Sequence, residues 1–250
     1  MAGAKLNSFL LVLSKCCPEL RALDVSCLRF SPAEVLTVSQ LFLILRKLDQ
    51  LDLSGSVPST ASFVQFLTLG TPGTLISARL CDHSFGSDPA SLRLLHETMP
   101  KAQAIKSLDL SNTDLGDDGV FYLAEGLTLN TNVRHLFING AVFRVDSKRP
   151  RAETVRALCK LVRSDCPLET LEMAGGPKAT QQLGRAVVPL LQTLIHNTRL
   201  TSLDISGHMF GTPGALALAR ALQLNATLAR VVYDQNDIGL QGLTALAYAA

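Results

Sequence analysis

Residues 200–214 read LTSLDISGHMFGTPG, and this stretch decides the fold. Leu203 and Ile205 flank a single polar residue, which is typical of a short strand with one buried face. Another apolar residue, Phe210, follows five positions later and leads into a Gly-x-x-Gly turn. The stretch therefore predicts a strand that turns sharply towards a second element.

The same apolar spacing recurs along the whole chain: apolar, two variable residues, apolar, one variable residue, apolar. The units begin at Leu20, Leu48, Leu75, Ile105, Val133, Leu168, Leu200 and Leu228. Successive starts are 28, 27, 30, 28, 35, 32 and 28 residues apart. A near-constant period of this size is the sequence signature of a solenoid built from stacked units.

A helical stretch follows the turn in these units. Leu218 and Leu222 lie one helical turn apart, as do Leu123 and Leu127 in the fourth unit. Three asparagines, Asn130, Asn197 and Asn225, stand where such helices end, and we expect them to adopt a left-handed C-cap. The predicted fold is an α/β leucine-rich-repeat solenoid, or horseshoe, with a concave parallel β-sheet, convex α-helices and about eight repeats.

The repeats are expected to cover residues 20–250, with the last one truncated, and residues 1–19 to form the helix of an incomplete or capping repeat. Leu6, Phe9, Leu10 and Leu13 make an apolar stripe in that first segment. At the other end, Leu243, Leu246 and Tyr248 are expected to face a further repeat. Because a solenoid needs polar caps, the sequence suggests a fragment of a longer protein.

Composition argues against several classes of function. The formal net charge is +2, so nothing requires nucleic acid as a partner. No apolar run approaches the ~18 residues of a membrane span, and no cleavage site marks a signal peptide. The six cysteines form no C-x-x-C pair and read as small buried hydrophobes of a reducing compartment.

No catalytic, cofactor or metal site is expected, because the hydrolase, metalloprotease and phosphate-loop motifs are all missing. Gly175-Gly-Pro-Lys178 is only weakly like a phosphate loop. His83 and His208 occupy the ninth repeat position and are expected to bond loop backbone. The sequence thus predicts a binding scaffold and no enzyme.

The fifth position of each unit points off the concave face of the predicted sheet. Five of its eight residues are acidic, which predicts a carboxylate stripe that attracts a basic partner, although Asp also simply suits a solvated strand there. Phe137 interrupts the stripe, either as a binding hot spot or as a residue packed under the inserted loop of its own repeat. The candidate protein-binding residues are Asp24, Asp52, Arg79, Asp109, His135, Phe137, Asn139, Glu172, Asp204 and Asp234.

The fifth unit, one of the two longest, carries a basic cluster on its loop and helix. Its members are Arg144, Lys148, Arg149, Arg151, Arg156, Lys160 and Arg163. The last three share one solvent face of a helix. This cluster is either a solvated helix face beside an inserted loop or a site for acidic lipid or protein, so peripheral membrane association is a second expectation.

A ~28-residue period with a full helix resembles the ribonuclease-inhibitor-like class of leucine-rich repeats, which includes Ran GTPase activators, tropomodulins, NOD-like receptors and CARMIL proteins (capping protein regulator and myosin-I linker). Residues 200–242 are more specifically similar to the last repeats of a CARMIL domain, where a helix closed by Asn precedes a strand ending in aromatic-Asp-x-Asn. Two residues depart from the pattern, because His208 replaces an Asn and Tyr233 stands where Trp is expected.

The CARMIL resemblance implies a cytoplasmic scaffold of the membrane-proximal cytoskeleton that takes part in regulating actin capping protein. The family's capping-protein-binding motif is a basic, Pro-containing tail segment that nothing here matches, so that contact would lie outside this sequence. Two alternatives remain open, a Ran GTPase-activating domain and the repeat domain of an innate-immune NOD-like receptor. The first requires a catalytic Arg with acidic residues on one rim, and the sequence marks no such Arg.

Overall fold

The computed structural model describes residues 8–9, 11–13, 15–31, 34, 45, 47–56, 77–82, 89–142 and 151–249. Eight parallel strands form one open sheet in chain order, and each strand covers the third to fifth positions of a predicted unit. The strands are β1 Ala22–Asp24, β2 Gln50–Asp52, β3 Ser77–Arg79, β4 Ser107–Asp109, β5 His135–Phe137, β6 Thr170–Glu172, β7 Ser202–Asp204 and β8 Arg230–Val232.

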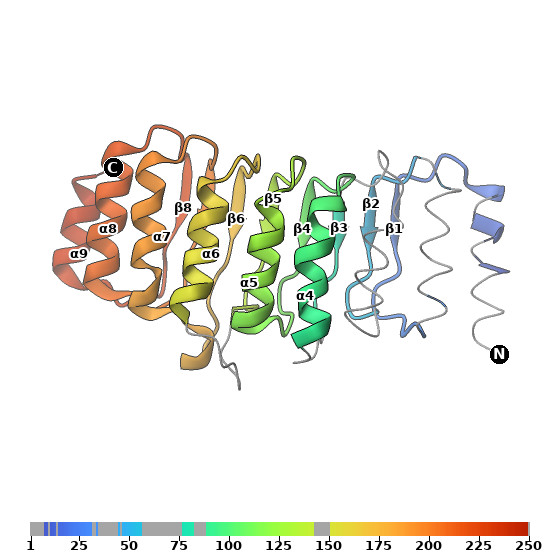
Figure 1. Cartoon of the computed structure of the whole chain (residues 1–250), viewed down its shortest axis with the longest axis horizontal. Coiled ribbons are helices and arrows are strands. Elements are labelled where there is room, and N and C mark those ends of the chain that lie inside the picture. Colours follow the sequence, from blue (N-terminus) through green and yellow to red (C-terminus); the bar gives the residue numbers. More distant parts are fainter. Residues whose placement is uncertain are drawn as a thin grey trace.

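Helices run beside the strands along one side of the sheet (Figure 1). The helices are α4 Pro89–Thr98, α5 Gly116–Leu127, α6 Arg151–Arg163, α7 Val188–Thr193, α8 Gly211–Leu224 and α9 Gly239–Ala247, with 3₁₀ turns at Met99–Lys101, Ala179–Gln181, Gly184–Val187 and Leu194–His196. Packed helices need ~8–10 Å each, whereas parallel strands need only ~4.8 Å. The stack therefore curves with the sheet on its concave side, and the predicted solenoid is confirmed.

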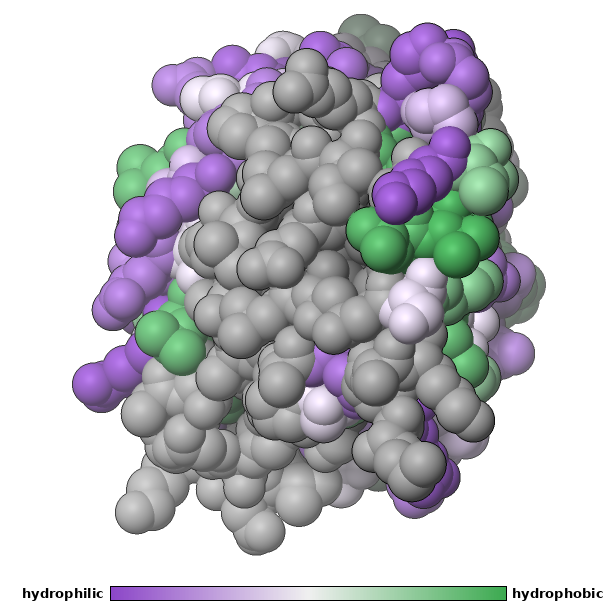
Figure 2. All heavy atoms as spheres, turned by 90° about the vertical axis from the view of Figure 1, so that its right-hand side faces the viewer, coloured by the Kyte–Doolittle hydropathy of each residue, from purple (hydrophilic) through white to green (hydrophobic). Residues whose placement is uncertain are grey.

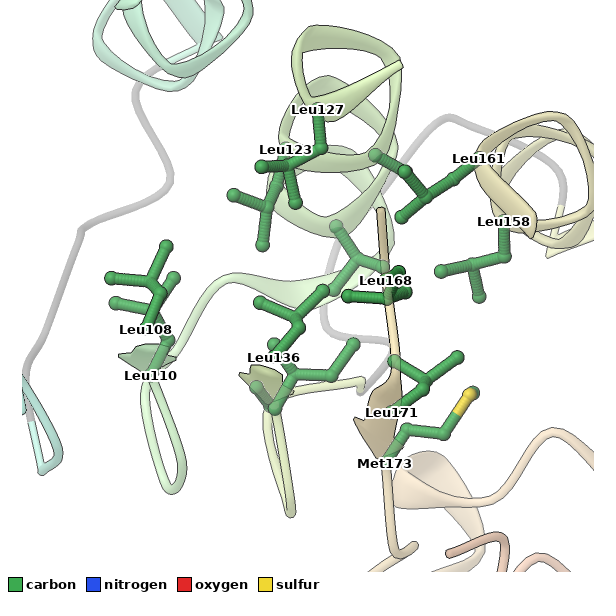
Figure 3. Packing of buried hydrophobic residues seen from close by; sticks show 14 of the residues in the cluster. Leu108, Leu110, Leu123, Leu127, Leu136, Leu158, Leu161, Leu168, Leu171 and Met173 are labelled. Carbon is green, nitrogen blue, oxygen red and sulfur yellow. The ribbon is translucent and has the colours of Figure 1, made fainter. Parts of the chain in front are cut away.

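The core lies between the sheet and the helices, and aliphatic side chains fill it. Leu136 and Leu171 of the strands point towards Leu123 and Leu158 of the helices (Figure 3). All four are at most 1% exposed. Because each unit supplies one strand and one helix, no unit can bury its apolar residues without its neighbours.

The eighth position of the units holds a feature that the spacing did not predict. Its backbone is left-handed in seven units, at Cys27, Gly55, Asp82, Asn112, Gly140, Gly207 and Gln235. This turn aims the backbone N–H at the next unit, and the Asn112 amide donates to the Asn139 carbonyl at 2.7 Å. The inter-unit hydrogen bonds thus continue past the strands into the loops.

The prediction of left-handed asparagine caps was wrong. Asn197 and Asn225 have extended backbones, and Asn130 is not among the residues with positive φ. Each uses its side chain instead: the amide donates to a carbonyl of the preceding unit, and the amide oxygen accepts backbone N–H groups two and three residues ahead. These residues tie a turn to its neighbour and do not merely end a helix.

The sixth unit departs from the expected single helix. Its convex segment is divided into 3₁₀ turns and the short α7, within which Pro189 stands in the first turn. Proline lacks an N–H and is tolerated only at the start of a helix, so a helix that begins upstream cannot run through this position. Gly184, with φ +55°, turns the chain just before it.

The predicted roles of the terminal apolar residues were only partly right. Figure 2 looks at the end of the stack that carries β1, and apolar residues lie on the surface there beside hydrophilic ones. Phe9 is 49% exposed, whereas Leu13 packs against the core; Leu6 and Leu10 lie outside the described residues. At the other end Leu246 is buried in the core instead of facing outwards, while Leu243 and Tyr248 are exposed.

The cysteines also divide. Cys81, Cys159 and Cys166 are buried as expected, and burial raises the pKa of Cys81 and Cys166 to about 11. Cys16 and Cys27 are exposed, contrary to the prediction that all are buried. Within the described part of the chain, no helix has the length and apolarity needed to cross a bilayer.

Candidate functional site

The fifth-position side chains form one straight row across the sheet, which we call the fifth-position column. The register pairs every member with the next one along. The column reads Asp24, Asp52, Arg79, Asp109, Phe137, Glu172, Asp204 and Val232. Because side chains alternate along a strand and the preceding residues face the core, this column lies on the concave face, as the sequence predicted.

Four of the aspartates have a local role that the sequence analysis missed. Asp24, Asp52, Asp109 and Asp204 each accept the backbone N–H of the serine two residues later, at 2.9–3.0 Å. For Asp24 these hydrogen bonds from Ser26 are the main cause of a lowered pKa. The repeated Asp-x-Ser signal was visible in the sequence and explains part of the preference for Asp at this position.

Arg79 divides the acidic part of the column. Its guanidinium lies 3.1 Å from Asp52 and 3.5 Å from Asp109, and Asp52 is the largest cause of its raised pKa. A shallow hollow of about 270 Å³ lies beside it over β1 to β3, with Asp24 and Asp52 in its lining. The first half of the column is therefore less negative than a plain count of its carboxylates suggests.

Phe137 is half-buried on the concave face and is not part of the apolar core. Two residues before Phe137, at the third position of the same unit, the ring of His135 contacts the Thr170 hydroxyl at 3.1 Å. Two residues after Phe137, at the seventh position, the Asn139 side chain donates to the Glu172 carboxylate at 3.3 Å. Its oxygen accepts the backbone N–H of Ala174 at 2.8 Å. The inserted loop of this repeat lies outside the described residues.

The last three strands carry a cation that the sequence analysis did not single out. Arg230, at the third position of its unit, lies 3.5 Å from Glu172 on the second strand away. Its side chain is 61% exposed. Asp204 lies on the strand between them, and Asp234 is exposed at the seventh position of the last unit. The fifth-position candidates thus stand in one row on the concave face, where Arg79 and Arg230 partly compensate the carboxylates.

His208 is a structural residue, as predicted. Its ring is fully buried, Nε2 contacts the Met173 carbonyl at 2.6 Å, and Nδ1 accepts the Leu183 amide at 3.3 Å. These two partners require a neutral ring that is protonated on Nε2. Burial is the main cause of its lowered pKa, which is about 4. His83, the other ninth-position histidine, lies outside the described residues.

The glycines of Gly175-Gly-Pro-Lys178 also have a packing role. A Cβ on Gly175 would lie 2.3 Å from the Gly207 carbonyl oxygen, and a Cβ on Gly176 would lie equally close to Gln181. The backbone of one unit therefore passes directly against its neighbour. This close approach accounts for Gly175, whereas Gly176 faces the Gln181 side chain of its own unit.

The described members of the basic cluster do not form one surface. Arg151 donates to the carbonyls of Thr180 and Gln182 and lies 3.7 Å from the buried Asp117. Arg156, Lys160 and Arg163 are exposed on α6, and Lys160 bonds Glu125 at 2.5 Å. Arg144, Lys148 and Arg149 lie outside the described residues.

Among the described residues, no three or more His, Cys, Asp or Glu side chains lie together in a group that could hold a metal ion. Charged and polar side chains are instead spread along the concave face, one row per unit. This arrangement suits contact with an extended surface of another macromolecule.

Comparisons with known proteins agree with this fold. The Leucine Rich repeat family model matches residues 102–124 and 196–219. Among solved structures, the complex of Rad7 and Elc1 from yeast superposes with a TM-score of 0.52 at 15% identity, covering 97% of this chain and 64% of that one. This likeness concerns the fold alone.

Two kinds of protein are among the curated relatives of this chain. Protein CARMIL of Dictyostelium discoideum is 29% identical over 223 residues, which are 88% of this chain and 21% of that protein. The human capping protein, Arp2/3 and myosin-I linker protein 3 is 30% identical over 161 residues, 64% of this chain and 11% of that protein.

The Rho GTPase-activating protein gacW of Dictyostelium discoideum is 38% identical over 155 residues, 62% of this chain and 14% of that protein. The chain therefore spans about a fifth or less of these relatives. The repeating strands, the matched repeat model and the extended CARMIL match together define the class: this chain is a leucine-rich-repeat protein whose sequence resembles CARMIL.

Proposed function

We propose that this chain is a non-catalytic repeat scaffold of a CARMIL-like regulator of actin capping protein and that its concave face binds a basic segment of a protein partner. The observation that carries the binding proposal is the fifth-position column, in which carboxylates of separate repeats stand in register on one face. The match to CARMIL over 88% of the chain supports the cytoskeletal part. On this proposal the protein acts in the cytoplasm, close to actin filaments.

A triple charge reversal tests the binding face. Asp52→Lys, Asp109→Lys and Asp204→Lys together should weaken binding of an unstructured Lys-rich peptide roughly 100-fold at ~0.1 M salt, because three ion pairs with the peptide are lost and replaced by repulsion. The measurement is fluorescence anisotropy at two salt concentrations. The matched control reverses Glu97, Glu125 and Asp165, which lie away from the sheet on or just after the helices. Equal loss in both variants, or no loss and no change in salt dependence, would remove the concave face as the site.

Growth of capped actin filaments tests the regulatory part. This chain alone is expected to leave capping protein in place, because the resemblance puts the capping-protein-binding motif in a tail segment that it does not match. A gene product that joins this chain to such a tail is expected to restore elongation of capped seeds, measured by pyrene-actin fluorescence. If the whole product leaves the ends capped, the capping assignment is wrong. If this chain alone uncaps them, the division between scaffold and tail is wrong.

A GTP hydrolysis assay with the same protein distinguishes a scaffold function from a GTPase-activating function. The partial match to a Rho GTPase-activating protein and the Ran-type alternative both predict faster GTP hydrolysis by the corresponding GTPase. A scaffold should leave the phosphate release rate of Rho and Ran proteins unchanged.

A further inference from the structure

The second half of the fifth-position column has a definite order. From β5 to β8 it reads Phe137, Glu172, Asp204 and Val232, so two carboxylates stand between two apolar side chains. All four are half-buried, on consecutive strands. A binding partner that crosses the strands therefore meets an apolar, an acidic, an acidic and an apolar contact in turn.

The spacing of this order suits a helix. Parallel strands lie ~4.8 Å apart, so the four contacts fall at about 0, 4.8, 9.6 and 14.4 Å. Helix residues i, i+3, i+7 and i+10 rise by about 0, 4.5, 10.5 and 15 Å and share one face within about 80°. An extended segment repeats its side chains on one face every ~6.7 Å, so its second side chain already lies about 2 Å beyond the strand that it should contact.

We propose that this face binds an amphipathic helix of the partner that lies across β5 to β8, with apolar residues at i and i+10 and cations at i+3 and i+7. This rests on the proposed function and specifies the kind of basic segment that is bound. Among the nine described residues at the third, fifth and seventh positions of β6 to β8, three are carboxylates, namely Glu172, Asp204 and Asp234, and one is a guanidinium, Arg230. The face is thus complementary to a cationic stripe.

Arg230 occupies part of this site in the free protein. Its exposed guanidinium reaches Glu172 across the strand that carries Asp204. Asn139 holds the same carboxylate from the other side, at 3.3 Å, beside Phe137. A cation at i+3 of the bound helix replaces Arg230 at Glu172, and the guanidinium turns to solvent. Binding is therefore opposed by a group of the protein itself.

Two helical peptides of identical composition test the order of contacts. One carries Leu, Lys, Lys and Leu at i, i+3, i+7 and i+10, and the other carries Lys, Leu, Leu and Lys at these positions in the same alanine-based helix. The first should bind the wild-type protein at least ~10-fold more tightly, by fluorescence anisotropy. Phe137→Ala should remove most of that preference, because the apolar contact at i is lost.

A substitution that strengthens binding separates this site from a merely acidic surface. Arg230→Gln frees Glu172 and should tighten the first peptide severalfold. The control is Arg79→Gln, which frees Asp52 and Asp109 outside the proposed site and should leave its affinity unchanged.

Three results would overturn the proposal in distinguishable ways. Equal binding of the two helices, or equal tightening by Arg230→Gln and Arg79→Gln, would mean that only total charge matters, and the concave scaffold would stand without the helix. Binding of the unstructured Lys-rich peptide in preference to both helices would replace the helix by an extended segment. Failure of all three peptides would end both this proposal and the basic-partner function.

Discussion

Replacing Asn130 by alanine is expected to lower the free energy of unfolding by roughly 4 kcal/mol. The side chain is 1% exposed and donates to the carbonyls of Met99, at 2.7 Å, and Ala102. Its oxygen accepts the amides of Asn132 and Val133, each at 2.8 Å. Alanine leaves these backbone groups without their side-chain partner in a buried turn, and an unpaired buried N–H or carbonyl is costly.

Urea unfolding followed by circular dichroism measures this loss. The control is Thr131→Ala in the same turn, because Thr131 is exposed and its hydroxyl donates to the Gln103 side chain at 2.8 Å on the surface. That variant should change the unfolding free energy by less than ~0.5 kcal/mol. A loss below 1 kcal/mol for Asn130→Ala would show that the asparagine does not join the repeats energetically.

Acid is expected to weaken the fold through His208 by roughly 3 kcal/mol between pH 6.5 and pH 4. The folded-state pKa of the ring is about 4, against an ordinary value of 6.5. In this pH window the unfolded chain binds a proton that the folded chain does not bind. The contribution of His208 to the free energy of unfolding is therefore fully present above pH 6.5. It is lost as the pH falls towards 4, and below pH 4 this residue causes no further loss.

The variant His208→Asn isolates this contribution. Asparagine does not titrate, so the variant should lose less stability than the wild type when urea unfolding at pH 7 is compared with unfolding at pH 5. His196→Asn is the control, because His196 is exposed and its variant should follow the wild-type curve. Parallel curves for the wild type and His208→Asn would show that His208 does not set the acid sensitivity.

Most of the fold follows from the sequence because its causes are local. The alternation around Leu203 and Ile205 sets a strand, and the steady interval between units sets the order of the sheet. The broken helix of the sixth unit could have been anticipated from Pro189. The extended backbone of Asn225 could not, because its cause is a pair of carbonyls in the preceding unit, Leu194 and Asn197.

The candidate binding face was also only partly predictable from the sequence. The register and the identity of the fifth-position residues were predictable, because strands at equivalent positions of successive repeats pair in register. The effect of Arg230 on Glu172 was not, since these residues lie two strands apart and at different positions in their units. A long side chain reaches diagonally, so the charge of the face depends on rotamers that a pattern of residue types does not contain.

Unequal spacing between units leaves the sheet unchanged. His135 pairs with Thr170 after 35 residues, and Leu108 pairs with Leu136 after 28, with the same phase. All the extra length is accommodated away from the strands. Insertions and deletions can therefore accumulate during evolution without changing which side chains stand next to one another on the inner wall, so that point substitutions alone retune what this surface recognises.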